Sequence, residues 1–487
     1  MLLLHIDSPI SQTSAFWCTA FHSSEPSLPF GPSSCLDMRV PRRTVPLEYE
    51  NGEGEPAETV AAATTRFGIR SDFLIPGRGK PITNGAVVVE GATIEWVGDF
   101  SHRPSKYSAV EFQHVKVLMP GLWDCHVHFG GHGLAFSTLS DSSAFLPGAP
   151  TLAGAVTVAD LRRTLEAGFT SVRELSGYST QSCGGYLWPG IRDGYLIGPN
   201  VFSSLTALSI TGGHGDEHEL PICAVKQFGE AGGSSYLCDG VDECIKAVRT
   251  MVRRGARCIK VCSSGGVLSL NDDPEDSQFS DDELKAIVDE TERTGRAVAA
   301  HAIGKAGILA ALRAGIKSIE HGCYLDEEVA ALMKEKGAIL VATRHIQESL
   351  LLDPSGFPEP IMRKIKKIVP LTRNNYDLAI EQGVKIALGT DTWNSNPEHR
   401  VAHGKNAMEL TYAVKAGMTP LQAIEAMTAT APEVLGKQAP KSGQLKAGYD
   451  ADLIGVAGNP LDDLAFLTNP DNVTHVWKGG KSYKAPA

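Results

Sequence analysis

The sequence predicts an α/β protein: a (β/α)8 TIM barrel with a small β-sandwich domain built from both chain ends. Three observations predict this fold. Eight short apolar runs alternate with longer helical patterns through the middle of the chain. Short β-rich runs, separated by Gly and Pro, occur on both sides of that region. Histidine, lysine and aspartate recur at the ends of the apolar runs, where a parallel barrel carries its functional groups.

The two ends of the chain differ from the middle in composition. Residues 1–64 are rich in Ser, Pro, Thr and Glu, so we expect a flexible extension that buries too little surface to fold. Residues 65–118 hold β-rich runs such as GAVVVEGATIEWVGDF, and residues 435–487 repeat this texture in ADLIGVAG and VTHVWKGGK. We expect these two segments to pair as the β-sandwich domain and residues 119–434 to form the barrel domain.

The middle of the chain supplies the strands and helices of the barrel. The predicted strands are, in order, LMPGLWDCHVH, TSVREL, NVFSSL, CIKVCS, AVAAHA, SIEHGC, AILVATR and KIALGTD. Helical stretches such as DECIKAVRTMVRRG and GKAGILAALRAG lie between them, and several end in Gly, as expected just past a helix C-terminus. Ser280 and Glu283 have the spacing of a capping box, which predicts a helix beginning there.

Composition and charge exclude several classes of function. The 487 residues carry a formal net charge of -11, which argues against a nucleic-acid partner. No apolar run reaches the roughly 18 to 20 residues of a membrane span, and the N-terminus lacks the basic region of a secretory signal. The ten cysteines are scattered without a CxxC pair, which is typical of reduced thiols. We therefore expect a cytoplasmic protein with no membrane partner.

Six chemically active residues fall at the ends of predicted strands. The first strand ends in Asp124-Cys125-His126-Val127-His128, and strict alternation would place Asp124 on the same face as both histidines. Each residue alone has an ordinary interpretation: an HxH by chance, a lysine reaching solvent, an aspartate capping a helix. Together at one rim, they predict a metal centre. The candidate ligands are His126, His128, Lys260, His301, His321 and Asp391.

This set of residues resembles the amidohydrolase superfamily. The resemblance covers about residues 66–487 and includes the closing GYDADLIGV segment. Further stretches (LMPGLWDCHVHFGG, GGHGD, KVCSSGGV, GTDT, HGKNAMEL and AGMTPLQAI) are similar to the branch of imidazolonepropionase-like Xaa-Pro dipeptidases and the fungal amidase that degrades ochratoxin. Within that branch, VATR and THVWKGGK are most similar to the ochratoxinase type.

The resemblance implies a catalytic site with two zinc ions. It implies that Lys260 is N-carboxylated and that its carbamate bridges both metals. Charge supports this ligand set, because two Zn²⁺ ions bring four positive charges and Asp391 alone would offset only one of them. The implied reaction is attack of a metal-bridging hydroxide on an amide carbonyl, with Asp391 as general base and then general acid. The resemblance also implies a homo-oligomer.

The substrate is expected to be a small-molecule amide whose cleavage releases an amino acid. Three types fit: an ochratoxin A-type amide, an N-acyl amino acid or an Xaa-Pro dipeptide. Candidate substrate contacts are His214 in GGHGD, Arg344 at the end of the seventh strand, Tyr236 and Tyr324.

One position departs from the branch, and alternatives remain open. Ile303 stands where relatives often carry a second histidine after the strand 5 ligand, which affects substrate choice and rate rather than the metals. The alternative functions are a one-metal deaminase, an imidazolonepropionase-like ring hydrolase and a metal-free scaffold. The deaminase type has a glutamate three residues after that ligand, where this chain has Gly304.

Overall fold

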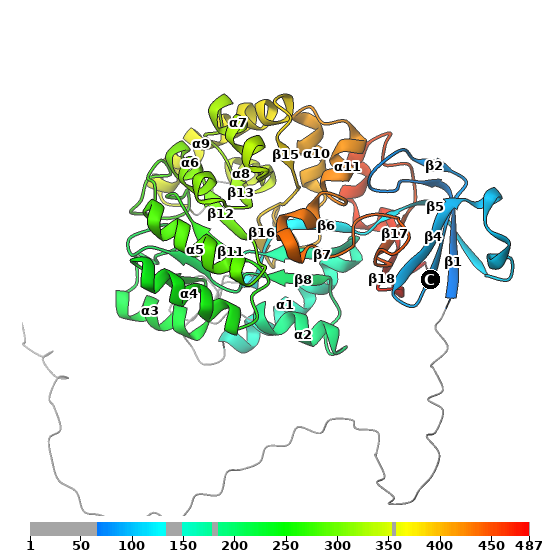
Figure 1. Ribbon diagram of the computed structural model, residues 1–487, viewed down its shortest axis with the longest axis horizontal. Helices are drawn as coiled ribbons and strands as arrows, with labels where there is room; N and C mark the ends of the chain where they lie inside the picture. The colour runs from blue at the N-terminus through cyan, green and yellow to red at the C-terminus, as the bar shows by residue number, and fades with distance from the viewer. Residues whose placement is uncertain (1–65, 133–148, 178–183, 353–356, 487) are drawn as a thin grey trace, which may run out of the picture. The chain divides into compact units, whose positions relative to one another are not determined.

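The computed structural model of this chain describes residues 66–132, 149–177, 184–352 and 357–486. These residues belong to one compact unit (Figure 1). The extension expected over residues 1–64 lies outside the described residues.

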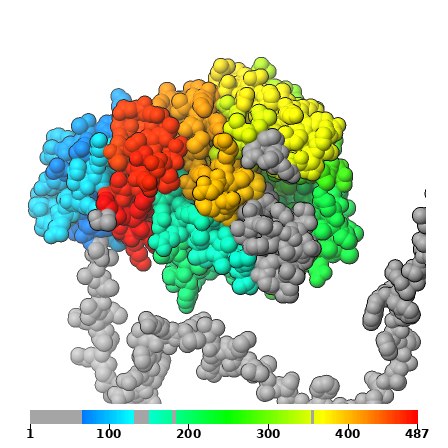
Figure 2. Space-filling view, turned by 180° about the vertical axis from the view of Figure 1, so that it is seen from behind, coloured from blue at the N-terminus to red at the C-terminus, as the bar shows by residue number. Residues whose placement is uncertain are grey.

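One sheet combines strands from both chain ends in the order β19-β18-β17-β5-β1-β3-β4, with β2 beside β1. β1 and β5 pair in parallel, whereas the other neighbours are antiparallel. Figure 2 shows the red C-terminal segment against the blue N-terminal strands, as the pairing of β17 with β5 requires. The expected pairing of the two chain ends is therefore present. The strands are β1 (Arg66–Leu74), β2 (Ile82–Thr83), β3 (Gly85–Glu90), β4 (Thr93–Asp99), β5 (Phe112–Pro120), β17 (Leu453–Val456), β18 (Val473–Lys478) and β19 (Lys481–Lys484).

Two further sheets are entirely parallel, and each of the eight predicted apolar runs holds one of their strands. The short strands β9, β10 and β16 were not predicted. The seven-stranded sheet has the order β10 (Ser235–Leu237), β9 (Ala207–Ser209), β11 (Ile259–Cys262), β12 (Val298–Ala302), β13 (Ser318–His321), β14 (Ile339–Val341) and β15 (Lys385–Ile386). The four-stranded sheet has the order β16 (Thr392–Asn394), β6 (Leu122–His132), β7 (Phe169–Glu174) and β8 (Asn200–Ser203).

Backbone hydrogen bonds join the two parallel sheets at both edges. Arg257, just before β11, donates its N–H to the carbonyl of Ser203 in β8 at 2.7 Å. At the other edge, Cys125 of β6 donates its N–H to the carbonyl of Leu388, just after β15, at 3.0 Å.

Helices separate the parallel strands along the chain, and Figure 1 shows α4, α5 and α6 outside β11 and β12. The predicted capping box of Ser280 and Glu283 begins α5, and Gly315 and Gly337 end α6 and α7 in the left-handed conformation. The α-helices are α1 (Ala149–Glu166), α2 (Gly184–Arg192), α3 (Ile222–Ala231), α4 (Val241–Arg253), α5 (Asp281–Arg293), α6 (Lys305–Ala314), α7 (Glu327–Lys336), α8 (Arg344–Leu352), α9 (Glu359–Glu381), α10 (Met408–Lys415) and α11 (Pro420–Ala426). The 3₁₀ helices are η1 (Phe100–His102), η2 (Ser105–Tyr107), η4 (Ala431–Gln438), η5 (Leu464–Thr468) and η6 (Pro470–Asn472).

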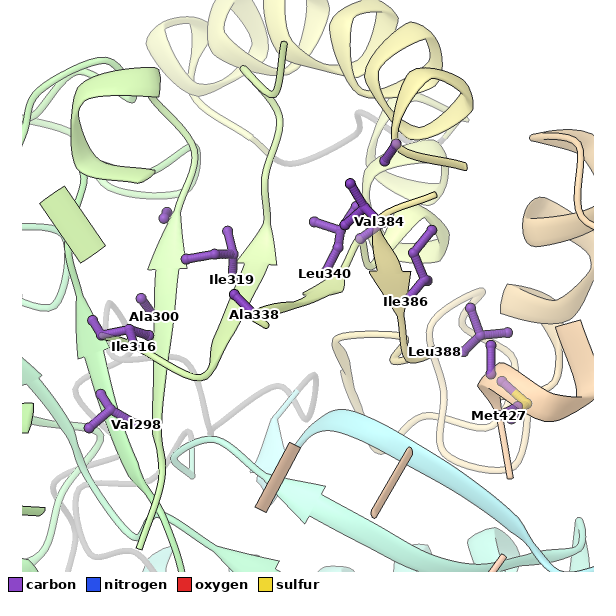
Figure 3. Close-up of a cluster of buried hydrophobic side chains, with 14 of the residues drawn as sticks. Val298, Ala300, Ile316, Ile319, Ala338, Leu340, Val384, Ile386, Leu388 and Met427 are labelled. Atoms are coloured by element: carbon purple, nitrogen blue, oxygen red, sulfur yellow. The ribbon is translucent and has the colours of Figure 1, made fainter. Parts of the chain in front are cut away.

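Both faces of the parallel strands are buried, as is usual for parallel sheets. Figure 3 shows part of one cluster, in which Ile319 of β13 lies between Ala300 of β12 and Leu340 of β14. Alternate residues of the same strands, such as Ala299 and Ile339, belong to a second cluster that includes residues of η4. This alternation explains why the strands read as continuous apolar runs in the sequence.

The strict alternation expected in the first strand is interrupted. The register of β6 against β7 shifts between Asp124 and Val127, as at a β-bulge. Asp124 therefore does not share the cavity with the two histidines. Its carboxylate accepts hydrogen bonds from the Thr390 hydroxyl at 2.6 Å and from the Asn406 amide at 2.8 Å.

No helix in the described ranges is long and apolar enough to cross a membrane.

Candidate metal centre and active site

A cavity of about 230 Å³ contains all of the predicted metal ligands on its wall. The strands bring these residues together from positions more than 260 residues apart, between His126 on β6 and Asp391 just before β16. One nitrogen each of His126 and His321 and one oxygen of Asp391 lie within 4.8 Å of one another, which makes a possible metal site. The six predicted ligands on the cavity wall are His126, His128, Lys260, His301, His321 and Asp391.

Hydrogen bonds orient all four histidine rings, three of them to oxygens that can only accept. His126 Nδ1 lies 2.9 Å from Glu320 Oε2, His128 Nδ1 lies 2.7 Å from the Ser176 carbonyl, and His301 Nε2 lies 3.1 Å from the Gly265 carbonyl. These oxygens can only accept, so each ring donates from that nitrogen. In the neutral imidazole the other nitrogen then carries a lone pair, which is the form that binds a metal.

Burial favours the neutral form of His126, His301 and His321. It lowers the pKa of His126 and of His301 well below the ordinary value, and neighbouring cationic groups act in the same direction. Burial also lowers the pKa of His321 to about 4. His321 Nδ1 lies 2.7 Å from the Thr343 hydroxyl, which orients this fourth ring.

Asp391 lies against two of the histidines. Its Oδ1 is 2.9 Å from His128 Nε2 and 3.7 Å from His126 Nε2. Burial raises the pKa of Asp391, whereas the positive charge that His126 and His128 carry when they are protonated lowers it by more. Among the described residues, Asp391 Oδ1 has no hydrogen-bond donor although it is buried. An ionised oxygen beside imidazole lone pairs is suited to a cation.

Four residues around these ligands have an unusual backbone conformation. Ser176, His321, Thr343 and Asp391 have φ values of 92°, 71°, 49° and 59°, in the left-handed region that non-glycine residues rarely adopt. Two of them are predicted ligands, and the other two orient a ligand ring. Backbone strain of this kind is typical of functional sites.

A buried ion pair behind His126 was not anticipated from the sequence. Arg173 of β7 donates to Glu320 at 2.7 Å and to the Cys125 carbonyl at 2.7 Å, and both charged side chains are fully buried. Glu320 in turn holds the ring of His126. A signal existed in the sequence, because TSVREL and SIEH each place a charged residue inside an apolar strand.

Lys260 on β11 is 4% exposed and lines the cavity. Burial lowers the pKa of this lysine, although the carboxylates of Glu320 and Asp391 act in the opposite direction. Burial therefore favours the neutral amine, which is the form that reacts with CO₂.

The predicted substrate contacts differ in position. His214 lines the cavity, and its ring stacks on that of His301 with a centroid distance of 4.2 Å. Burial lowers the pKa of His214 to about 4. Among the described residues that line the cavity, Arg344, Tyr236 and Tyr324 are absent. The polar group of each contacts a glutamate instead: Arg344 with Glu348, Tyr236 with Glu230 and Tyr324 with Glu275.

Ile303 lines the cavity, as its position after β12 suggested. It packs with Cys323 and Ile368, and the neighbouring part of the cavity wall is also apolar. The aliphatic residues of this wall are Val267, Leu268, Leu270, Ile303, Ile346, Leu350, Ile365, Ile368 and Val369.

Comparison with known proteins assigns the family. The amidohydrolase family matches residues 117–483, which hold every predicted ligand. The chain belongs to the amidohydrolase family. Members of this family typically use metal ions, and the histidines and Asp391 provide a donor set that fits them.

Individual relatives confirm the predicted branch. The chain is 45% identical to ochratoxinase from Aspergillus niger over 433 residues, 86% of each protein. The crystal structure of that ochratoxinase matches with a TM-score of 0.79 and 43% identity, over 87% of this chain and 96% of that one. The structure of an Xaa-Pro dipeptidase with bound methionine in its active site matches with a TM-score of 0.73 and 29% identity, over 86% of this chain and 100% of that one. The chain is also 25% identical to an imidazolonepropionase from Paracoccus denitrificans over 385 residues, 76% of this chain and 87% of that protein.

Proposed function

We propose that this amidohydrolase hydrolyses the amide bond of a small molecule and releases an amino acid. The observation that carries the proposal is the convergence of six predicted ligands on one cavity, with imidazole lone pairs and a carboxylate oxygen lacking a proton donor. Similarity to an ochratoxinase and to an Xaa-Pro dipeptidase supports an amide as the bond that is cleaved. N-acyl amino acids, Xaa-Pro dipeptides and ochratoxin A-type amides are the candidate substrates.

Two zinc ions would occupy the centre. His126, His128, Lys260 and Asp391 would hold one ion, and Lys260, His301 and His321 the other. Imidazole and carboxylate ligands without thiolates suit catalytic zinc. When bound, the metals would polarise the substrate carbonyl and lower the pKa of water.

Asp391 would move the proton of the reaction. Its Oδ1 has no donor among the described residues, and bound cations would hold it ionised at neutral pH. We propose that it accepts a proton from the attacking water and delivers it to the leaving nitrogen.

N-carboxylation of Lys260 is the second chemical proposal. Burial favours the neutral amine that the modification requires. Protein supplied with ¹³C-labelled bicarbonate should give a carbamate carbon signal in NMR, and a Lys260→Ala variant should lack it. If both proteins gave the same spectrum, Lys260 would not be the modified residue.

The two parallel sheets would form one (β/α)8 barrel. Two hydrogen bonds support closure, from Arg257 to Ser203 at one edge and from Cys125 to Leu388 at the other. We propose residues 119–434 as the barrel domain, and residues 65–118 with 435–487 as the β-sandwich domain.

Two proposals concern the protein in the cell. We propose that the protein is cytoplasmic. The described cysteines are all free, as is usual for proteins of that compartment. We also propose a homo-oligomer, which the molar mass in solution would test.

The proposed activity is tested by metal analysis together with a substrate panel. Purified protein is expected to contain two zinc ions per chain and to release an amino acid from at least one amide among N-acyl amino acids, Xaa-Pro dipeptides and ochratoxin A. The panel should include an imidazolone and an adenosine, because their turnover instead would indicate a ring hydrolase or a deaminase.

A matched pair of histidine variants provides the control. His301→Ala should lose metal and activity, whereas His114→Ala should keep both, because the His114 side chain on β5 is half exposed and pairs with Asp72. Absence of both metal and turnover in the unmodified protein, even with zinc and bicarbonate, would indicate a scaffold.

A further inference from the structure

A chain of hydrogen bonds leads away from the cavity behind His214. His214 Nδ1 lies 2.9 Å from Ser269 Oγ, and the Ser269 hydroxyl donates to Asp272 Oδ1. Asp272 is fixed in turn, because Lys364 of α9 donates to Oδ1 at 3.1 Å and Gly266 N–H donates to Oδ2 at 2.8 Å. The Asp272 side chain is 2% exposed, so this carboxylate is an internal anchor.

The donors and acceptors along this chain of hydrogen bonds determine the tautomer of His214. An ionised carboxylate can only accept, so the single hydroxyl proton of Ser269 is directed to Asp272. Ser269 Oγ can then only accept from the ring of His214, which must carry its proton on Nδ1. In the neutral ring, Nε2 keeps its lone pair.

Packing holds the ring of His214 in this place. One face stacks on His301 at 4.2 Å between centroids, with an interplanar angle of 21°. Gly266 passes so close that a Cβ at that position would lie 1.9 Å from Nδ1 of the ring. The SGG run at residues 264–266 thus makes room for the imidazole, and any side chain at Gly266 would displace it.

Nε2 of His214 takes no hydrogen bond from any residue that the structure describes, and the residue lines the cavity. We propose that Asp272 and Ser269 hold His214 as the tautomer with an unprotonated Nε2, and that this nitrogen accepts a hydrogen bond from the N–H of a secondary amide substrate. This inference rests on the proposed amide hydrolysis and narrows its substrate class.

Recognition of an N–H on the scissile nitrogen would distinguish between the candidate substrate types. N-acyl amino acids and ochratoxin A-type conjugates carry an N–H on the scissile nitrogen. The scissile nitrogen of an Xaa-Pro dipeptide is tertiary and carries none. The inference therefore favours the first two substrate types over Xaa-Pro dipeptides. Ser269 and Asp272 act through His214 and are positioning residues.

The tautomer can be measured without turnover. Zinc-loaded protein labelled with ¹⁵N-histidine should show His214 with a protonated Nδ1 and a bare Nε2. Because the chain has 15 histidines, the His214→Gln variant is needed to assign the signal by difference. A proton found on Nε2 of His214 would overturn the inference, whatever the enzyme's activity.

Kinetics test the N–H contact with a matched substrate pair, N-benzoylphenylalanine and its N-methyl derivative. Ser269→Ala should lower kcat/KM for the N–H amide roughly tenfold more than for the N-methyl amide. Ser269→Thr keeps a hydroxyl and should restore the preference. The NMR signal of His214 in Ser269→Ala should show both tautomers.

The outcomes distinguish this inference from the proposed function. Equal turnover of the two amides by the unmodified protein would overturn the inference and leave amide hydrolysis standing. Turnover of neither amide, nor of the wider panel, would overturn amide hydrolysis and the substrate part of this inference with it. An equal loss on both amides in Ser269→Ala would show a general structural role and would also overturn the N–H contact.

Discussion

At the scale of single residues, two predicted ligands of the metal centre have a strained backbone conformation. His321 and Asp391 both adopt the left-handed conformation, at a cost on the order of 1 to 3 kcal/mol each. Backbone hydrogen bonds help to hold this conformation, such as that from the Asp391 N–H to the His126 carbonyl at 2.8 Å. A bound cation would offset part of this cost, because it would interact with the lone pairs of the histidine rings and of Asp391.

The role of Asp391 can be tested by one substitution. Asp391→Asn keeps an oxygen ligand but removes the base, so we expect kcat to fall by about 10² to 10⁴-fold with much of the metal retained. Steady-state kinetics on a responsive amide and metal analysis measure the two effects. Asp72→Asn on β1 serves as control because Asp72 is exposed, and it should not change either quantity. Full turnover by metal-loaded Asp391→Asn would rule out the proposed proton transfer.

The ion pair behind His126 should matter both for metal binding and for stability. Glu320→Gln leaves the buried charge of Arg173 without its partner, so we expect a loss of about 3 to 5 kcal/mol in the free energy of unfolding. Weaker orientation of His126 should reduce metal affinity about 10 to 100-fold. Urea unfolding and competition with a chelator measure these changes.

A surface pair provides the comparison for Glu320. Glu425→Gln removes a partner of Arg78 in an exposed pair and should cost no more than about 1 kcal/mol. Similar losses in the two variants would mean that the Arg173–Glu320 pair has no special role.

The predicted metal ligands were easier to identify from the sequence than the residues that orient them. The six predicted ligands line one cavity, and spacing and residue type were enough to select them from the sequence. Glu320 and Arg173 could not be paired from the sequence, because their contact joins strands 147 residues apart. Asp124 was placed on the wrong face because the alternation rule does not anticipate a register shift.

At the scale of elements, helix α8 depends on a residue from another helix. Glu409 of α10 accepts the N–H groups of Arg344 and His345 at 3.2 and 2.7 Å, which satisfies the first turn of α8. Seven consecutive residues of α8, from Arg344 to Leu350, are buried. These buried residues include Arg344, Gln347 and Glu348, so α8 is polar in sequence although it is buried, and an apolar periodicity could not predict it.

Glu409 should make the stability of the protein depend on pH. Burial raises the pKa of Glu409 to about 8 in the folded protein, above its ordinary value of 4.5. The folded state then holds a proton that the unfolded state releases, so stability should fall as pH rises from about 5 to 8. Glu409→Gln removes the titrating group and with it on the order of 3 kcal/mol of this decline, although its amide nitrogen cannot accept one of the two N–H groups.

Denaturant unfolding of both proteins at several pH values measures the effect of Glu409. Between pH 5 and pH 8 the free energy of unfolding should fall for the unmodified protein and change less for the variant, so their difference should shift in favour of the variant as pH rises. Parallel curves across that range would contradict the raised pKa.

At the scale of the whole molecule, metal loss should loosen the fold. Four imidazoles and Asp391 would face one another without a cation, and a ligand that binds only the folded state stabilises it. Treatment with a chelator should therefore lower Tm and abolish activity, and zinc with bicarbonate should restore both. The unfolding temperature of His301→Ala should respond less to the chelator. If the chelator left the Tm of the unmodified protein unchanged, bound metal would not contribute to its stability.

The alternation of strands and helices was the most predictable property of the whole chain. Each apolar run became a strand because both of its faces are buried. The short strands β9, β10 and β16 lie outside these eight runs, whereas β14 and β15 are equally short but lie within the runs AILVATR and KIALGTD. The positions of β9, β10 and β16 depend on pairing with distant neighbours, which one sequence cannot reveal.

The mixed sheet also determines the order in which a growing chain can complete its structure. A ribosome that has synthesised the chain through Asn394 has supplied every strand of both parallel sheets. Only β1 to β5 of the mixed sheet exist at that moment, and β5 has an open edge until β17 arrives. The nascent protein therefore carries an exposed strand edge through the synthesis of some sixty residues, from Asn394 to Leu453. Translation speed over this stretch would set how long that edge can pair with other nascent chains.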